Sequence, residues 1–89
     1  MFLSQTLAAL ADPNRQKILK VLKKSEQPVS EIAKNLNITL ATLSHHLDIL
    51  RRAGLVSSRR EGRQIFYELN LSVTEEIIEG LIKMFKTEK

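Results

Sequence analysis

The chain has 89 residues, and 43% of them are hydrophobic, so there is room for one compact domain whose core is marginal at this size. It contains no cysteine, which excludes a disulfide framework, a thiolate metal site and a cysteine nucleophile. No apolar run approaches the length of a membrane span, and no basic stretch leads into an apolar core at the amino end, so we expect a cytoplasmic protein.

The net charge of +4 is concentrated in one segment, residues 51–63. That segment holds five arginines and one acid, while the rest of the chain balances at nine basic and nine acidic residues. A guanidinium group suits phosphate oxygens, and a local basic patch is typical of nucleic-acid-binding domains. A solvated basic turn would give the same composition, so charge alone leaves both interpretations open. The arginines are Arg51, Arg52, Arg59, Arg60 and Arg63, and the acid is Glu61.

Two helices are predicted at the amino end. The apolar residues of segment 2–11 recur at helical spacing. Asp12 can cap a second helix and Pro13 suits its first position, so we expect that helix over residues 13–24, with Ile18 and Leu22 buried.

A short helix and a sharp turn are predicted next. After an extended piece at residues 28–29, Ser30 can cap a helix of about two turns over residues 31–36. Asn37 tolerates the left-handed conformation that a sharp turn needs. The pattern predicts the first half of a helix-turn-helix.

The following helix is expected over residues 40–53. Thr39 can cap it, its apolar face consists of Leu43, Leu47 and Leu50, and Gly54 can end it. A helix, a tight turn and a longer helix form the helix-turn-helix arrangement.

Two strands and a last helix complete the chain. Residues 55–60 and 64–70 are strand-like, and Gly62 can supply the positive φ of a hairpin loop between them. Ser72 begins a capping box that opens a helix reaching about Lys86. A hairpin directly after a helix-turn-helix forms a wing. The predicted fold is therefore mainly α with a small β-hairpin, a winged helix-turn-helix of five helices in a single domain over residues 1–89.

The helix over residues 40–53 carries the surface that we expect to contact DNA. The amino-terminal residues of such a helix reach base edges in the major groove. Small polar side chains stand here where Lys and Glu usually dominate, which favours close approach over an ordinary solvated face. Asp48 counts mildly against this, because phosphate repels a carboxylate. The candidate DNA contacts on this helix and its cap are Thr39, Leu40, Ala41, Thr42, Ser44, His45 and Arg52.

The predicted hairpin carries the remaining candidate contacts. Arg59, Arg60 and Arg63 lie on either side of its tip, where they are expected to reach phosphates or the minor groove. Such contacts supply affinity and register rather than sequence information.

The first and last helices are more apolar than the surface of a small monomer should be. These residues could be core, but a wide apolar stripe needs covering, and a two-fold dimer covers it. We therefore expect a homodimer. Its predicted interface consists of Phe2, Leu3, Leu7, Leu10, Val73, Ile77, Ile78, Leu81, Ile82 and Phe85.

Four segments together match the pattern of a known family. They are residues 12–19 (DPNRQKIL), 43–50 (LSHHLDIL), 53–56 (AGLV) and 60–69 (REGRQIFYEL). In these segments the chain resembles the ArsR/SmtB family of winged-helix repressors, and the likeness covers almost the whole sequence. The resemblance implies a homodimer that represses by covering a double-stranded DNA operator, often that of its own transcription unit.

The chain departs from the metal-sensing members of that family. Two cysteines near the start of the third helix form one family site, and residues 28–30 here are Pro-Val-Ser. The other family site uses Asp and His on the last helix, which here has glutamates and no His, so a transition metal lacks its nitrogen donors. We expect no metal or cofactor, and the chain looks most like the metal-independent, SdpR-like autorepressor branch. Release by a protein anti-repressor is left open.

Catalytic and metal-binding interpretations of the helix over residues 40–53 are weaker. Ser44, His45 and Asp48 name a hydrolase triad, but Ser44 and His45 point about 100° apart on one helix and no oxyanion hole is evident, so we expect no enzyme. Adjacent histidines diverge and cannot ligate one ion alone. We expect His46 in the half-buried seam between the third and fourth helices, with His45 facing DNA.

Two other functions remain as alternatives to a repressor. One is a winged helix that binds another protein and no DNA. The other is a ligand-responsive sensor in which Glu75, Glu76 and Glu79 assist a hard cation, although three acids in a first helical turn more simply favour the helix dipole.

Overall fold

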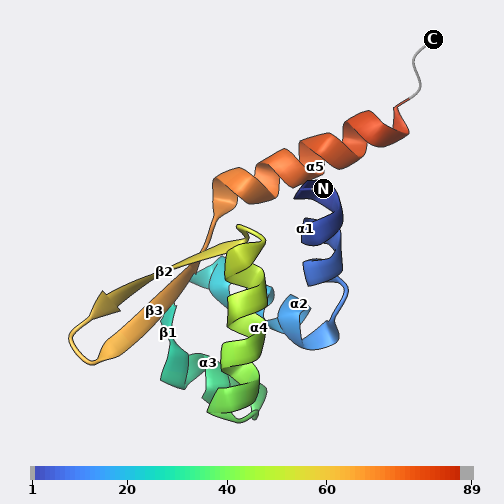
Figure 1. Cartoon of the computed structure of the whole chain (residues 1–89). Helices are drawn as coiled ribbons and strands as arrows, with labels where there is room; N and C mark the ends of the chain where they lie inside the picture. The colour runs from blue at the N-terminus through green and yellow to red at the C-terminus, as the bar shows by residue number, and fades with distance from the viewer. Residues whose placement is uncertain (1, 87–89) are drawn as a thin grey trace.

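The computed structural model describes the backbone of residues 2–86 and the side chains of residues 4–86. Five helices surround one end of a small antiparallel sheet, as the winged helix-turn-helix prediction requires (Figure 1). In the sheet β3 lies between β1 and β2. The elements are α1 (Phe2–Leu10), α2 (Pro13–Lys24), β1 (Gln27–Pro28), α3 (Val29–Leu36), α4 (Leu40–Arg52), β2 (Val56–Glu61), β3 (Gln64–Leu69) and α5 (Leu71–Phe85).

The core lies where α2, α3 and α4 meet. The predicted apolar face of α4 is confirmed, because Leu43, Leu47 and Leu50 are all buried there. Ile18 of α2 and Ile32 of α3 are fully buried in the same cluster. Burial of such side chains contributes about 1.5–3 kcal/mol each, which fixes α4 on the body of the protein and leaves its other face in solvent.

Several predicted turn and cap signals are confirmed. The Asp12 carboxylate accepts hydrogen bonds from the backbone N–H groups of Asn14 (2.7 Å) and Arg15 (3.2 Å), so it caps α2. Asn37 has a φ of 54° and gives the sharp turn between α3 and α4. Gly54 has a φ of 81° directly after α4, a conformation that glycine adopts without steric cost.

The predicted starts of two helices were wrong. Helix α3 begins at Val29, with Pro28 at its N-cap, so Ser30 lies inside the helix and does not cap it. Helix α5 begins at Leu71, and the side chain of Asn70 accepts from the backbone N–H of Val73 at 3.4 Å. Asn is as good an N-cap as Ser, and it comes first along the chain, so the capping box at Ser72 does not form.

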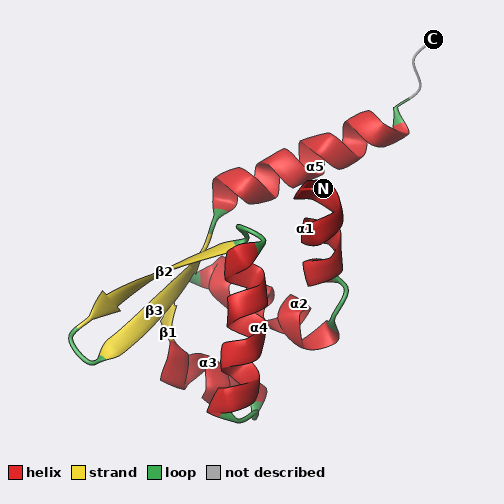
Figure 2. Cartoon of the chain, in the orientation of Figure 1, coloured by secondary structure: helices red, strands yellow, loops and turns green. Residues whose placement is uncertain are grey.

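The sheet is a hairpin with a short third strand. Along β2 and β3 the register pairs Val56 with Leu69 at the base and Glu61 with Gln64 at the tip, where Gly62 has a φ of 63°. Strand β1 adds two pairs on the other edge of β3. Figure 2 shows the hairpin projecting well beyond the helices, as a wing does.

Helix α5 crosses α1 and then runs on beyond it (Figure 1). Near the crossing Ile77 is buried, and past it most apolar side chains of α5 are exposed, namely Ile78, Ile82, Met84 and Phe85. Among the described residues, no helix is both long and apolar enough to span a membrane.

Candidate nucleic-acid interface

The amino-terminal turn of α4 is a capped and solvent-facing surface. The backbone N–H of Thr42 donates to Oγ1 of Thr39 at 3.1 Å, so Thr39 is the N-cap, as predicted. The Thr39 hydroxyl also donates to Oγ1 of Thr42 at 3.0 Å. The other predicted contacts on this turn are exposed as well, namely Leu40, Ala41, Ser44 and His45. A helix terminus with small, exposed polar side chains is suited to approach another surface closely.

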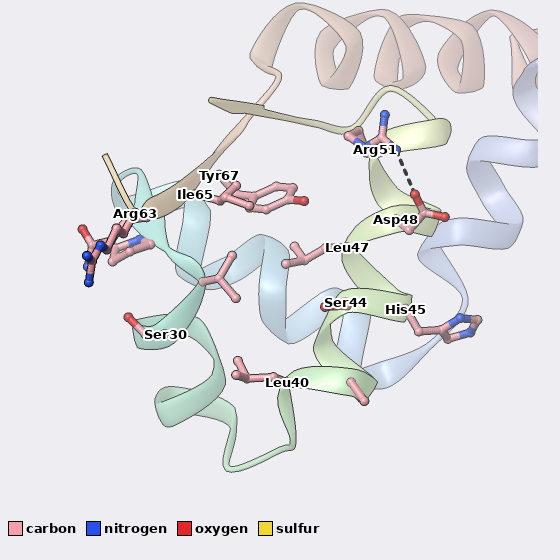
Figure 3. Close-up of a pocket in the computed structure, with 14 residues that line it drawn as sticks. Ser30, Leu40, Ser44, His45, Leu47, Asp48, Arg51, Arg63, Ile65 and Tyr67 are labelled. Carbon is pink, nitrogen blue, oxygen red and sulfur yellow. Dashed lines mark hydrogen bonds and ion pairs between the residues drawn. The ribbon is translucent and has the colours of Figure 1, made fainter. Parts of the chain in front are cut away.

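The hairpin and α4 border a single open groove. Leu40, Ser44 and His45 line it from the helix, and Arg63, Ile65 and Tyr67 line it from the hairpin (Figure 3). The two elements that the sequence marked for DNA contact therefore face one groove in the folded chain, which residues 28–30 also line. This juxtaposition connects residues about 18 to 27 positions apart, and no local pattern in the sequence encodes it.

Arg60 and Arg63 lie on the groove side of the hairpin. Arg63 lines the groove, and Arg60 pairs in register with Ile65, which also lines it. Directly opposed residues share one face of a sheet. Both arginines are exposed, and within residues 4–86 neither forms an ion pair. Their positive charge is therefore available to an anionic partner.

Arg59 occupies the opposite face of the hairpin. Successive residues of a strand point to opposite faces, and Arg59 pairs with Phe66 rather than with a groove residue. Its Nε donates to Oε2 of Glu26 at 2.8 Å, and its Nη1 lies 3.1 Å from Oε1 of Glu61. Hydrogen bonds to Glu26 and Glu61 raise the pKa of the Arg59 guanidinium above its ordinary value. The sequence predicted that Arg59, Arg60 and Arg63 act together on DNA. The structure instead places Arg59 on the opposite face of the hairpin from Arg60 and Arg63.

The carboxylate of Asp48 is neutralised within α4. Its Oδ1 lies 2.9 Å from Nη2 of Arg51 (Figure 3). Its Oδ2 lies 2.9 Å from Nη2 of Arg52. Two cations beside one carboxylate offset the repulsion of phosphate that Asp48 would cause alone. Arg52, a predicted DNA contact, is therefore already paired with Asp48 on the solvent side of α4.

Comparison with known proteins decides the family. Residues 12–58, from the cap of α2 into β2, match the family described as "Bacterial regulatory protein, arsR family". The matching segment covers more than half of the chain and includes the whole helix-turn-helix. The chain belongs to the ArsR family.

Two curated relatives show which kinds of regulator this ArsR protein is similar to. It is 36% identical over 80 residues to the transcriptional repressor SdpR of Bacillus subtilis, and the match covers 90% of this chain and 89% of SdpR. It is 37% identical over 79 residues to the transcriptional activator HlyU of Vibrio cholerae, covering 89% of this chain and 73% of HlyU. The family consists of DNA-binding regulators, so this ArsR protein is not an enzyme, in agreement with the sequence analysis.

Solved structures of ArsR-type regulators share the fold. An ArsR-like transcriptional regulator from Rhodococcus sp. RHA1 superposes with a TM-score of 0.86 at 30% identity, covering 93% of this chain and 78% of that one. HlyU from Vibrio cholerae gives a TM-score of 0.77 at 35% identity, covering 92% and 89%. The predicted winged helix-turn-helix fold of this ArsR protein is confirmed.

His46 of this ArsR protein contacts a different helix from the one expected. Its side chain is 7% exposed, and its Nδ1 lies 3.1 Å from Nη1 of Arg15 on α2. The prediction placed it in a half-buried seam between α3 and α4, whereas the side chain is buried and its hydrogen-bond partner lies on α2. Arg15 also donates from Nε to the carbonyl oxygen of Ala9 at 2.7 Å, at the end of α1.

Sequence reasoning missed this role of Arg15. The last carbonyl groups of any helix lack partners within it. The side chains of Arg15 and Gln16 provide hydrogen-bond donors for these carbonyl groups of α1. Nε2 of Gln16 donates to the carbonyl oxygen of Leu10 at 2.8 Å. Two long donor side chains just after a helix end were the available signal.

The apolar residues of α1 and α5 divide between core and surface. Ile77 is 4% exposed and belongs to the core, so its assignment to a dimer interface was wrong, and Leu10, Val73 and Leu81 are half-buried against the same core. Phe85, at 79% exposure, is among the exposed members of the predicted set. The side chains of Phe2 and Leu3 lie outside the described residues. The exposed members are Leu7, Ile78, Ile82 and Phe85.

In the described part of the chain, no group of three or more His, Cys, Asp or Glu side chains is placed to hold a metal ion. The three acids on α5 that the sequence offered as a weak cation site, Glu75, Glu76 and Glu79, are exposed and lie beyond the first turn of that helix. The expectation that these acids occupy the first helical turn and favour the helix dipole was wrong, because the helix begins at Leu71 and that interaction fades beyond the first turn.

Proposed function

We propose that this chain is a repressor that binds an inverted-repeat DNA operator as a homodimer. The observation that carries the proposal is the common groove bordered by α4 and the hairpin. A polar helix terminus and two unpaired arginines on one side of the molecule suit the two parts of DNA recognition, which are base contacts and phosphate contacts.

Each side chain of the interface has a proposed task. The amino-terminal turn of α4 enters the major groove, where Thr42, Ser44 and His45 hydrogen-bond base edges or phosphates. Leu40, which is exposed although apolar, contacts a thymine methyl group, and Ala41 beside it is small enough to do the same. Arg60 and Arg63 hold the flanking phosphates from the wing. Thr39 and Arg52 serve mainly through the shape of α4, since one caps it and the other pairs with Asp48.

The dimer would form through the exposed apolar stripe on α1 and α5. Ile78, Ile82 and Phe85 recur at helical spacing on α5, and Leu7 of α1 is also exposed. Exposing such an apolar stripe to water is unfavourable, and a two-fold interface covers it with the same stripe of an identical copy. Two copies of α4 then enter successive major grooves, so half-sites should be centred about 10 base pairs apart, or a small multiple of that.

We further propose that repression is autogenous and independent of metal. The similarity to the transcriptional repressor SdpR over nine-tenths of the chain supports repression, and the autogenous part rests on the resemblance to repressors that often control their own transcription unit. Support for independence of metal is the donor set, because the chain has no cysteine and its last helix has no histidine. The relatives also include the activator HlyU, so the sign of regulation has to be measured.

The test is a mobility-shift titration of the DNA upstream of the chain's own coding region, with heparin as a polyanion competitor and a promoterless duplex as control. We expect a heparin-resistant complex on the upstream DNA, lower expression from that promoter in a reporter strain, and unchanged affinity across a panel of divalent metals. Equal binding to both duplexes would refute an operator, and higher expression would refute repression. An affinity that changes with one metal would favour the ligand-responsive alternative.

A further inference from the structure

The side chain of Arg59 crosses the outer face of the wing. It starts on β2, which pairs only with β3, and it ends at Glu26, the residue before β1 on the far edge of β3. Between these points its guanidinium lies over the ring of Phe66 on β3, 4.9 Å from the ring centroid. The ion pair of Arg59 with Glu26 thus connects β2, across β3, to the loop that leaves α2.

Backbone pairing alone holds the wing to the helices weakly. Strand β1 pairs with β3 at two positions, Gln27 with Tyr67 and Pro28 with Phe66. The rest of the hairpin projects away from the helices (Figure 1). A two-stranded hairpin is marginally stable without further support, so additional attachments decide how firmly its tip is held.

We propose that Arg59 is a positioning residue that fixes the orientation of the wing through Glu26 and Phe66 and does not itself bind phosphate. On this account it holds Arg60 and Arg63, which lie on the groove side, where they meet the DNA backbone. The inference rests on the proposed DNA-binding function and assigns a different task to one of the three arginines of the wing.

The surroundings of Arg59 are unfavourable for phosphate. Glu26 and Glu61 both bind its guanidinium and would repel an approaching anion. Arg60, one residue along the strand, points to the other face. An exposed ion pair and an exposed cation–π contact are individually weak. Losing them would loosen the wing, and the cost of ordering it again on DNA would lower affinity by about three- to tenfold.

The experiment compares single and paired substitutions by operator affinity at several salt concentrations. Arg59→Gln and Glu26→Gln should each lower affinity about three- to tenfold and leave the slope of log affinity against log salt unchanged. Arg60→Gln is the matched control, and it should reduce that slope by about 1, because one phosphate contact is lost. Arg59→Glu should bind most weakly, and adding Glu26→Arg should recover at least half of the loss in log affinity, because the ion pair is restored in reverse.

If Arg59→Gln reduces the salt slope by about 1 while Glu26→Gln changes nothing, or if Glu26→Arg fails to rescue Arg59→Glu, Arg59 binds phosphate and the inference is wrong. If the unaltered chain binds no duplex DNA, the proposed function fails. The role of Arg59 in holding the wing is then tested in the free protein by the mobility of the wing. Backbone order parameters of residues 59–64 should then fall below about 0.6 in Arg59→Gln and Glu26→Gln and stay high in Arg60→Gln, and equal values in all three would overturn it.

Discussion

The guanidinium of Arg15 lies 3.1 Å from Nδ1 of His46 and so joins α2 to the buried side of α4. The same guanidinium donates from Nε to the carbonyl oxygen of Ala9 at 2.7 Å, so α1 meets the other two helices at one side chain. Because the guanidinium of Arg15 can only donate, Nδ1 of His46 is the acceptor in this contact. The position of α4 therefore depends on α1, which also carries part of the proposed dimer stripe.

Replacing Arg15 by methionine should destabilise the protein. Arg15→Met keeps the length of the side chain and removes every donor, so His46 and the end of α1 lose their partner. We expect the free energy of unfolding in urea to fall by about 1–3 kcal/mol, as for other hydrogen bonds from charged donors. Lys17→Met, on the exposed side of the same helix, should change it by no more than about 0.5 kcal/mol. Equal effects of the two substitutions would show that Arg15 is not a structural junction.

The cap of α2 should make stability depend on pH. Burial acts to raise the pKa of Asp12, but hydrogen bonds from the backbone N–H groups of Arg15 and Asn14 outweigh it and lower that pKa below 3.8. A carboxyl with a lowered folded-state pKa contributes stability above its unfolded pKa and loses it as pH falls through the folded value. Asp12→Asn keeps an effective cap without the titration. The difference in Tm between the two proteins should therefore shrink as pH falls from about 5 toward 2, whereas a constant difference would contradict this assignment.

The cap of α4 offers a test of local stability at the proposed interface. Thr39→Ala removes the oxygen that accepts from the backbone N–H of Thr42. Loss of an N-cap side chain typically costs about 1 kcal/mol, so we expect the free energy of unfolding, measured by thermal denaturation, to fall by about that amount. Thr39→Ser retains a capping hydroxyl and should stay close to the unaltered protein. A Thr39→Ala protein as stable as Thr39→Ser would mean that this cap contributes nothing.

The apolar stripe on α5 should control the oligomeric state. Ile82→Glu places a charge in the stripe, and Lys83→Glu places the same charge about 100° away on the polar side of the helix. Sedimentation velocity should find monomers for Ile82→Glu and dimers for Lys83→Glu at concentrations where the unaltered chain is dimeric. Dimers in both variants would place the interface elsewhere.

Patterns within a few residues predicted most of the secondary structure. Asp12, Asn37 and Gly54 each have a chemical property that suits one backbone position, and the structure puts each of them there. Where two good caps lay close together, as Asn70 and Ser72 do, local chemistry could not rank them. In the structure β3 ends at Leu69, so Asn70 is the first residue free to cap a helix, and α5 begins at Leu71.

The site was predictable in its elements and less so in its individual side chains. Strand alternation does separate Arg59 from Arg60, but which of them faces α4 depends on how β3 packs against the helices. The partner of His46 and the burial of Ile77 are set by contacts between helices far apart in sequence. Such contacts leave no periodic signal in a single chain.

The central claim is that the first turn of α4 reads bases while Arg60 and Arg63 hold phosphates. Selection from a pool of randomised duplexes, sequenced after binding to the unaltered chain, His45→Ala and Arg60→Ala, tests it most directly. The unaltered chain should enrich an inverted repeat with half-sites about 10 base pairs apart, or a small multiple. His45→Ala should change the preferred bases within each half-site, and Arg60→Ala should enrich the original sequence at lower affinity. Absence of an inverted repeat, or a changed base preference in Arg60→Ala alone, would contradict the account.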